Sequence, residues 1–201
     1  MSNRIKHLVI LTGPMGVGKS TTLTSLLDPE SETIPGLNSI DLDSSWEIWN
    51  PASFLKRDID VPLPERMIFQ YELTRLITRP GFSLTDFDKD PALEIRRLTE
   101  RISLITLWAP GEIIARRVKS RMPLAIRVME NFNPSRRHLA AFELYSDPSK
   151  LATLYLNWLE FWALNALESN LVIDISNEQS SLIPLAEFMN FLQAENLSPS
   201  K

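Results

Sequence analysis

Short apolar runs alternate with longer helical segments along this chain, and proline and glycine separate them. The apolar runs contain few polar residues, which is typical of strands that are covered on both faces of a sheet. The alternation predicts an α/β fold with a mainly parallel sheet. Strands are predicted at residues 7–12, 38–42, 82–86, 102–108 and 171–175.

The segments between these strands are predicted to be helical. Asp147 followed by Pro148 is typical of a helix start, and Tyr155, Trp158 and Trp162 recur at a spacing that predicts a buried helix face. Helices are predicted at residues 19–27, 65–78, 91–101, 112–120, 149–168 and 181–194.

Two stretches do not fit this alternation of predicted strands and helices. Residues 46–64 are rich in proline, aspartate and aromatic residues, and residues 121–137 are basic and contain Pro123 and Pro134. Loops of this length in a compact domain are usually functional or disordered. We therefore expect residues 1–201 to form one domain that carries two irregular surface insertions.

Length and composition agree with one globular domain. The chain has 201 residues, of which 44% are hydrophobic and 23% charged, and a chain of this size buries roughly 70% of the surface that it exposes when unfolded. The formal net charge of −4 argues against a nucleic-acid partner, since nucleic-acid-binding proteins usually carry a basic patch.

Some classes of protein are excluded by residues that the chain lacks. It has no cysteine, which excludes disulfides, thiolate catalysis and zinc sites built on cysteine. No segment approaches the roughly 20 continuous apolar residues that span a bilayer, and the first apolar run is too short for the core of a signal peptide. We expect a cytoplasmic protein without membrane contact, either a monomer or a homodimer.

The segment after the first predicted strand has the pattern of a phosphate-binding loop. It matches G-x-x-x-x-G-K-[ST] at every fixed position and leads directly into a predicted helix. A glycine-rich turn that binds nothing is the alternative interpretation. The matching residues are Gly13-Pro14-Met15-Gly16-Val17-Gly18-Lys19-Ser20.

The chemistry of phosphate binding explains this spacing. Glycines allow consecutive backbone N–H groups to turn inward as an anion-binding nest, and the start of the helix adds its positive dipole end. Lys19 is expected to reach the β- and γ-phosphates, and the Ser20 hydroxyl to ligate Mg²⁺. We predict that ATP with Mg²⁺ binds to Gly13–Ser20 and to Thr21, which follows in the helix.

Carboxylates follow the second and third predicted strands, at the sheet edge where ligands bind in α/β folds. Asp41 and Asp43 alternate, so one is expected near Mg²⁺ and the other can accept a proton from a substrate hydroxyl. Asp86 is a second candidate for the carboxylate near Mg²⁺. The alternatives are a solvated turn at Asp41–Asp43 and a helix N-cap cluster formed by Asp86, Asp88 and Asp90.

The second insertion is dense in basic residues. In phosphoryl transfer, guanidinium groups neutralise charge on the transferring group, so residues 121–137 are interpreted as a lid, with Arg117 and Arg121 as its first candidates. A solvated charged helix face and a grip on a phosphorylated or polynucleotide substrate are the alternatives. Together with those at the end of the preceding predicted helix, the basic residues are Arg116, Arg117, Lys119, Arg121, Arg127, Arg136 and Arg137.

The loop from Gly13 to Thr21, together with Asp41-x-Asp43-x-x-Trp46-Glu47, resembles the shikimate kinase family, whose pattern is GxMGxGKS/T followed by DxDxxIE. The resemblance implies ATP as donor and a P-loop αβα sandwich with a parallel sheet of order 2-3-1-4-5. It also implies that Asp41 lies toward magnesium and Asp43 toward the accepting hydroxyl. It does not extend to the substrate contacts, so it suggests the reaction class and not the acceptor.

The leading hypothesis is an ATP-dependent kinase that phosphorylates a hydroxyl of a small molecule, with Lys19, Asp43, Arg117 and Arg121 as catalytic residues. In this hypothesis residues 46–64 lie on the acceptor side, and Ser20 with Asp41 or Asp86 holds the metal. A polynucleotide or nucleoside kinase is the second hypothesis. The third is a regulatory P-loop ATPase that has no small-molecule acceptor.

Overall fold

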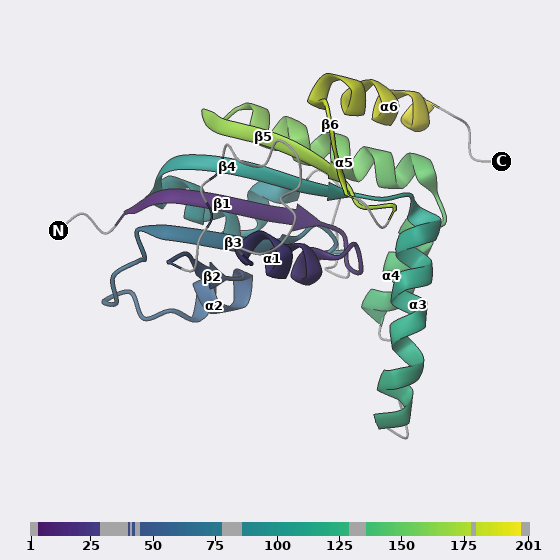
Figure 1. Cartoon of the computed structure of the whole chain (residues 1–201), viewed down its shortest axis with the longest axis horizontal. Coiled ribbons are helices and arrows are strands. Elements are labelled where there is room, and N and C mark those ends of the chain that lie inside the picture. The colour runs from purple at the N-terminus through teal and green to yellow at the C-terminus, as the bar shows by residue number, and fades with distance from the viewer. Residues whose placement is uncertain are drawn as a thin grey trace.

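The computed structural model describes residues 4–28, 40, 42, 45–77, 86–128, 136–177 and 180–197, with only the backbone described for residues 86 and 121–128. Six strands form one sheet in the order β2-β3-β1-β4-β5-β6 (Figure 1). The first five strands are parallel, and β6 pairs antiparallel with β5 at the edge. The strands are β1 Ile5–Gly13, β2 Glu47–Trp49, β3 Arg66–Glu72, β4 Thr99–Trp108, β5 Leu167–Asp174 and β6 Ser181–Ile183.

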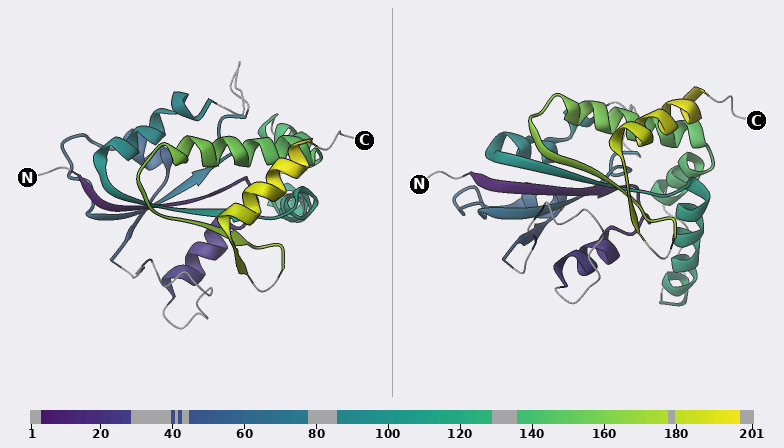
Figure 2. Two further views of the ribbon diagram at one scale, coloured as in Figure 1. Left: turned by 90° about the horizontal axis from the view of Figure 1, so that it is seen from above. Right: turned by 45° about the horizontal axis from the view of Figure 1, so that its top comes forward.

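Helices cover both faces of this sheet, so the predicted α/β class is confirmed. The views in Figure 2 place α1 on one face and α5 on the other, while α6 crosses the β5 edge. No helix in the described part of the chain combines the length and the apolar character of a membrane span. The helices are α1 Lys19–Leu27, α2 Pro51–Lys56, α3 Gly111–Val128, α4 Arg136–Tyr145, α5 Pro148–Ala163 and α6 Leu185–Leu197, with 3-10 helices η2 Asp86–Lys89 and η3 Pro91–Leu98.

The second and third strands along the chain, β2 and β3, are not the predicted ones. Residues 66–72 form β3, although a helix was predicted at 65–78. Within the predicted strand 38–42 only Ile40 and Leu42 are described, and neither lies in a strand. Of the predicted strand 82–86, residues 82–85 lie outside the described residues, and Asp86 begins η2. The numerical order of the first five strands therefore agrees with 2-3-1-4-5, but with different segments.

The prediction of a helix at 65–78 is wrong because a short apolar run fits a buried strand as well as a buried helix. Met67, Ile68, Phe69 and Tyr71 are all buried, as expected for a central strand with helices on both faces. β3 pairs with β1 on one side and with β2 on the other. Pairing with two neighbours is a long-range property that local spacing does not reveal.

The two expected insertions are more regular than predicted. Within 46–64 the chain forms β2 and then α2, which Asn50 caps by accepting hydrogen bonds from the backbone N–H groups of Ala52 and Ser53. Residues 121–128 continue α3, and Arg136 begins α4. The rest of the predicted lid, residues 129–135, lies outside the described residues.

Other predicted elements agree more closely. The helix at 19–27 is confirmed as α1, and the aromatic helix is confirmed as the buried α5, which Asp147 caps. Trp158 stacks on Tyr71 of β3 with ring centroids 5.1 Å apart, so α5 is anchored to the centre of the sheet. Residues 91–98 form a 3-10 helix, and the segment predicted as one helix at 181–194 divides into β6 and α6.

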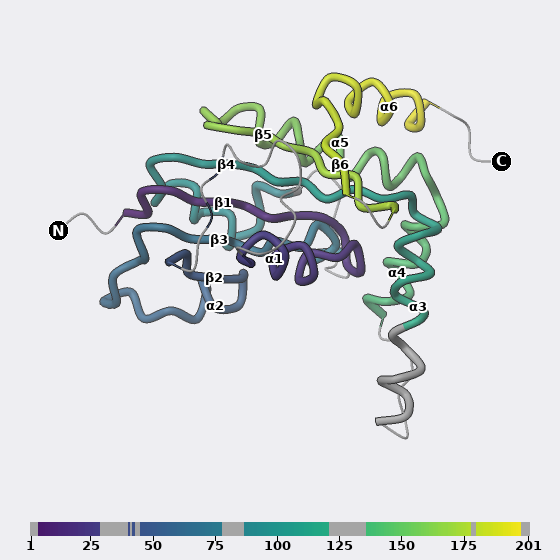
Figure 3. The backbone as a smooth tube through the Cα atoms, in the orientation of Figure 1, coloured from purple at the N-terminus to yellow at the C-terminus, as the bar shows by residue number. Residues whose placement is uncertain are grey.

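The carboxyl ends of the central strands meet at one edge of the sheet. The turn after β1, the end of β3 and the start of α3 all lie there, and Figure 3 traces α3 and α4 side by side at this end. Ligands of parallel α/β sheets bind at this edge. The fold therefore brings the glycine loop, Gly13–Ser20, to the expected place.

Candidate functional site

The glycine loop connects the end of β1 to the start of α1, as the sequence predicts. Gly13, Gly16 and Gly18 have φ angles of 149°, 83° and 120°, which non-glycine residues rarely adopt. Gly16 is also required for space, because a Cβ there would collide with Cγ2 of Val118 on α3. The glycines thus allow both the inward turn of the loop and its close contact with α3.

Lys19 folds back over this loop. Its Nζ donates hydrogen bonds to the carbonyl oxygens of Gly13 and Pro14, at 2.9 and 2.8 Å. Burial lowers the pKa of Lys19 to about 8, with a smaller opposing effect of the Glu72 carboxylate, which raises it, and a further lowering by Arg137. The ammonium is therefore held at the inner side of the loop, where an anionic group would stabilise its charge.

The outer side of the loop is held by three side chains from other elements. The Tyr145 hydroxyl donates to the Met15 carbonyl at 2.7 Å, and the Met15 N–H donates to Thr74 Oγ1 at 3.2 Å. Burial raises the pKa of Tyr145, so its hydroxyl stays protonated and can donate. Arg117 donates to the carbonyls of Val17 at 3.1 Å and Ile175 at 2.6 Å.

Arg117 was predicted to be a lid arginine, and its guanidinium contacts the backbone of the loop. The guanidinium ties the loop to the end of β5 from outside, and Arg117 is not among the described residues that line the cavity next to the loop. These carbonyl partners indicate a clamp on the backbone, and the predicted lid role of Arg117 stays a prediction. Arg121 lies in the part of α3 for which only the backbone is described, so its predicted role stays a prediction.

Glu72 is a carboxylate that the sequence reasoning missed. It ends β3, and its Oε1 accepts hydrogen bonds from Arg137 Nη2 at 2.6 Å and from Thr74 Oγ1 at 2.7 Å. It was missed because residues 65–78 were predicted to be helical, so that no strand end was expected there. An acid directly after the mostly apolar run 67–71 is the signal that could have identified it.

Arg75 follows β3 and is fixed by a buried acid. Its Nε donates to Asp90 Oδ2 at 2.7 Å, and Asp90 also accepts hydrogen bonds from the Tyr71 hydroxyl and the Ala92 N–H. Asp90 is 1% exposed. The N-cap interpretation of this acidic cluster is thus confirmed for Asp90, which caps η3.

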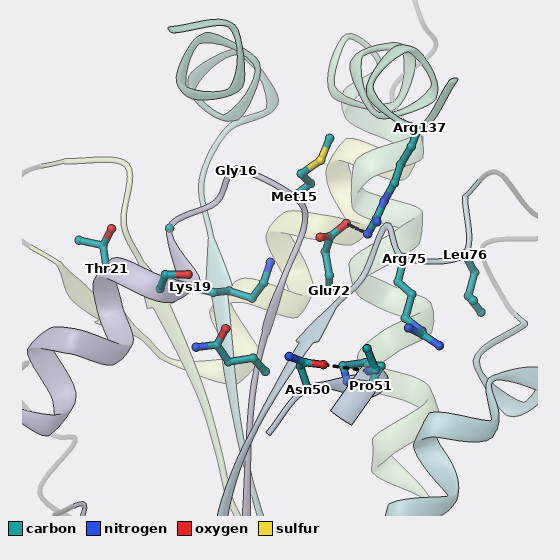
Figure 4. Close-up of a pocket in the computed structure, with 14 residues that line it drawn as sticks. Met15, Gly16, Lys19, Thr21, Asn50, Pro51, Glu72, Arg75, Leu76 and Arg137 are labelled. Atoms are coloured by element: carbon teal, nitrogen blue, oxygen red, sulfur yellow. Dashed lines mark hydrogen bonds and ion pairs between the residues drawn. The ribbon is translucent and has the colours of Figure 1, made fainter. Parts of the chain in front are cut away.

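A cavity of about 530 Å³ joins these groups. One wall belongs to the loop and α1, and the opposite wall comes from β3, the β2–α2 junction and α4 (Figure 4). The loop wall includes Met15, Gly16, Gly18, Lys19, Ser20 and Thr21, and the opposite wall includes Asn50, Gln70, Glu72, Arg75 and Arg137.

The predicted metal residues are only partly described. Ser20 is exposed and lines the cavity, whereas Asp41 and Asp43 lie outside the described residues, and Asp86 begins η2 instead of ending a strand. The described residues contain no group of three or more His, Asp and Glu side chains that could hold a metal ion. The positive-φ glycines and Lys19 fit a nucleotide phosphate, and a hydroxyl with one carboxylate fits a magnesium ion whose other ligands are phosphate oxygens and water.

A second, larger cavity of about 1030 Å³ lies between α3, α4, α5 and α6. Aromatic side chains such as Trp108, Phe142 and Phe191 form much of its wall. Neither Lys19 nor the glycine loop is among the described residues that line it, so the smaller cavity is the candidate site.

The chain was also compared with known proteins. The comparison with protein families and the search of curated proteins give no match to this chain, so the site geometry carries the functional argument.

Proposed function

We propose that this protein is an ATP-dependent phosphotransferase that acts on a hydroxyl of a small molecule. The observation that best supports this is the cavity itself, in which a glycine loop with its lysine faces a carboxylate and two arginines. Its volume of about 530 Å³ is within the range of small-molecule pockets, roughly 300–1,000 Å³. A polynucleotide would need an extended basic groove, and a regulatory switch has no need for acceptor space.

The loop side of the cavity would bind the nucleotide. Lys19 would exchange the carbonyls of Gly13 and Pro14 for phosphate oxygens, which restores a charged partner to its ammonium. The Ser20 hydroxyl, with Asp41, would hold Mg²⁺, which neutralises phosphate charge. Thr21 lies at the start of α1, where the helix dipole favours an anion.

Glu72 is the described carboxylate that can receive the proton of the acceptor hydroxyl. As this proton moves to Glu72, the acceptor oxygen forms a bond to the γ-phosphorus. The bond between that phosphorus and the oxygen bridging to the β-phosphate breaks, and its electron pair leaves with ADP. Asp43 remains the sequence-based candidate for the same role.

Arg137 is a further candidate for the role that the sequence-based hypothesis gave to Arg117 and Arg121. It lines the cavity from the start of α4, and its guanidinium is paired with Glu72 at 2.6 Å. A guanidinium at this position can neutralise charge that develops on the transferring phosphoryl group. Its pairing with Glu72 also orients the carboxylate.

The proposal is tested by nucleotide binding and phosphate transfer with the Lys19→Ala variant. ATP with Mg²⁺ should raise the Tm of the parent protein and transfer labelled phosphate to a member of a hydroxyl-compound library. Lys19→Ala should lose both properties while its circular dichroism is unchanged. Lys6→Ala is the matched control, because Lys6 lies near the opposite end of β1 in an exposed ion pair with Glu65. Equal nucleotide binding by Lys19→Ala and the parent would refute the proposal.

A further inference from the structure

Arg75 and Asp90 form a charged pair at the wall of the cavity opposite the glycine loop. Asp90 is buried, whereas the Arg75 side chain is 20% exposed and lines the cavity. The Nε and Nη2 groups of Arg75 contact the two oxygens of Asp90 at 2.7 and 3.5 Å. Asp90 thus occupies the edge of the guanidinium that carries Nε and Nη2.

The contacts around Asp90 make this orientation rigid. Its carboxylate also accepts from the Tyr71 hydroxyl at 2.9 Å and from the Ala92 N–H at 3.0 Å. A buried carboxylate is tolerated only when it is paired and hydrogen-bonded, and these contacts satisfy it. Among the described residues Asp90 is the acceptor that Arg75 binds, so N–H groups on the other edge of the guanidinium are available to a ligand.

Neighbouring side chains on the same wall also offer donors. Asn50 uses Oδ1 to accept from the N–H groups of Ala52 and Ser53, at 2.9 and 3.0 Å. Its amide NH₂ therefore remains as a donor, and the Gln70 amide lines the same wall. Arg75 and Asn50 both lie on the side of the cavity away from Gly16 (Figure 4).

We propose that the acceptor carries an oxyanionic group, a carboxylate or a phosphate, which Arg75 binds at this wall. A rigid guanidinium edge matches the two oxygens of such a group. Asp90 is a positioning residue that fixes the orientation of Arg75, and the bound anion directs the acceptor hydroxyl toward Glu72. This inference rests on the proposed function, because it names the acceptor class of that same site.

Anion binding at Arg75 can be measured without knowing the acceptor. Inorganic phosphate and acetate are titrated separately into protein saturated with ADP and Mg²⁺, which occupies the loop, and binding is followed by calorimetry and Tm. Saturable binding of phosphate alone indicates a phosphorylated acceptor, and binding of acetate as well indicates a carboxylate. We expect Arg75→Gln to weaken this binding about tenfold or more and Arg75→Lys to restore part of it.

Controls separate this site from the loop and from general charge effects. Arg97→Gln removes an exposed arginine that pairs with Glu94 and should bind the anions like the parent. The same titration in Lys19→Ala, without nucleotide, detects binding at Arg75 even if the protein does not bind ATP, so the two proposals can fail separately. Equal anion binding by Arg75→Gln and the parent, or no binding by the parent, would overturn the inference.

The positioning role of Asp90 is tested with Asp90→Asn, which should weaken anion binding but leave ADP binding unchanged. If this variant does not fold, Tyr71→Phe removes one of the hydrogen bonds to Asp90 without a change of charge and should weaken anion binding to a smaller degree. A purely structural role would lower the Tm of the unliganded protein and leave anion affinity unchanged. That result would overturn the role assigned to Asp90.

Discussion

Gly13 and Glu72 are register partners in the parallel pair of β1 and β3. The first residue of the glycine loop and the carboxylate at the end of the neighbouring strand are therefore fixed next to each other by backbone pairing. The Leu73 N–H donates to the Gly13 carbonyl at 3.1 Å, and the same carbonyl accepts from Lys19. The pairing of β1 with β3 therefore places Glu72 beside the residue whose carbonyl Lys19 contacts.

Stability should depend on pH through Lys19. Its pKa in the folded protein is about 8, below the ordinary value of 10.5, so above pH 8 the unfolded chain binds more protons at this residue. The contribution of Lys19 to the free energy of unfolding should therefore rise between about pH 8 and 10.5. Urea unfolding across this range should show the rise in the parent and not in Lys19→Met, and parallel curves for the two proteins would contradict the prediction.

ATP binding should reverse this pKa shift. Phosphate oxygens beside the ammonium favour its charged form, so binding above pH 8 should be accompanied by proton uptake. Calorimetry at pH 8.5 in buffers of different ionisation enthalpy measures this uptake directly. An observed enthalpy that does not depend on the buffer would show that Lys19 does not meet the phosphates.

Gly16→Ala should destabilise the protein and abolish nucleotide binding. The substitution forces alanine to a φ of 83° and drives its Cβ into Val118, for which we expect a loss of about 1–3 kcal/mol. The double variant Gly16→Ala/Val118→Ala should remove the steric collision but not the backbone strain. Urea unfolding of both variants checks this, and a fully stable Gly16→Ala protein would exclude the observed loop geometry.

Glu72→Gln separates the two candidate bases. Glutamine can still accept from Thr74, but it cannot take the proton of a hydroxyl, so kcat should fall by about 10²–10⁴ while ATP affinity changes little. Asp43→Asn should produce that loss instead if the sequence-based hypothesis is correct. Steady-state kinetics and ATP titrations on both variants decide between them. If neither variant loses activity, neither residue is the base.

Arg117→Met distinguishes a clamp from a lid. Loss of the hydrogen bonds to Val17 and Ile175 leaves two carbonyls without their partner, so Tm and ATP affinity should both fall, by about 1–3 kcal/mol in stability. A lid arginine would instead lower kcat and leave the unliganded Tm unchanged. Thermal unfolding and ATP titration of this variant distinguish the two roles.

Local chemistry in the sequence was sufficient for several parts of this protein. The glycine loop, the bounds of α1, the cap at Asp147 and the buried face of α5 all follow from neighbouring residues and helical spacing. Such features depend on backbone geometry and side chains within a few residues of one another, so a single sequence reveals them.

The tertiary structure decided the rest of the site. β3 became a strand through its pairing with β1 and β2, and only this pairing brings Glu72 beside the loop. Arg75 binds Asp90, which is 15 residues away in the sequence. Arg117 donates a hydrogen bond to Ile175, which is 58 residues away. Hydrogen bonds and ion pairs between distant segments depend on how the elements pack, and the hydrophobic pattern of each segment alone does not specify that packing.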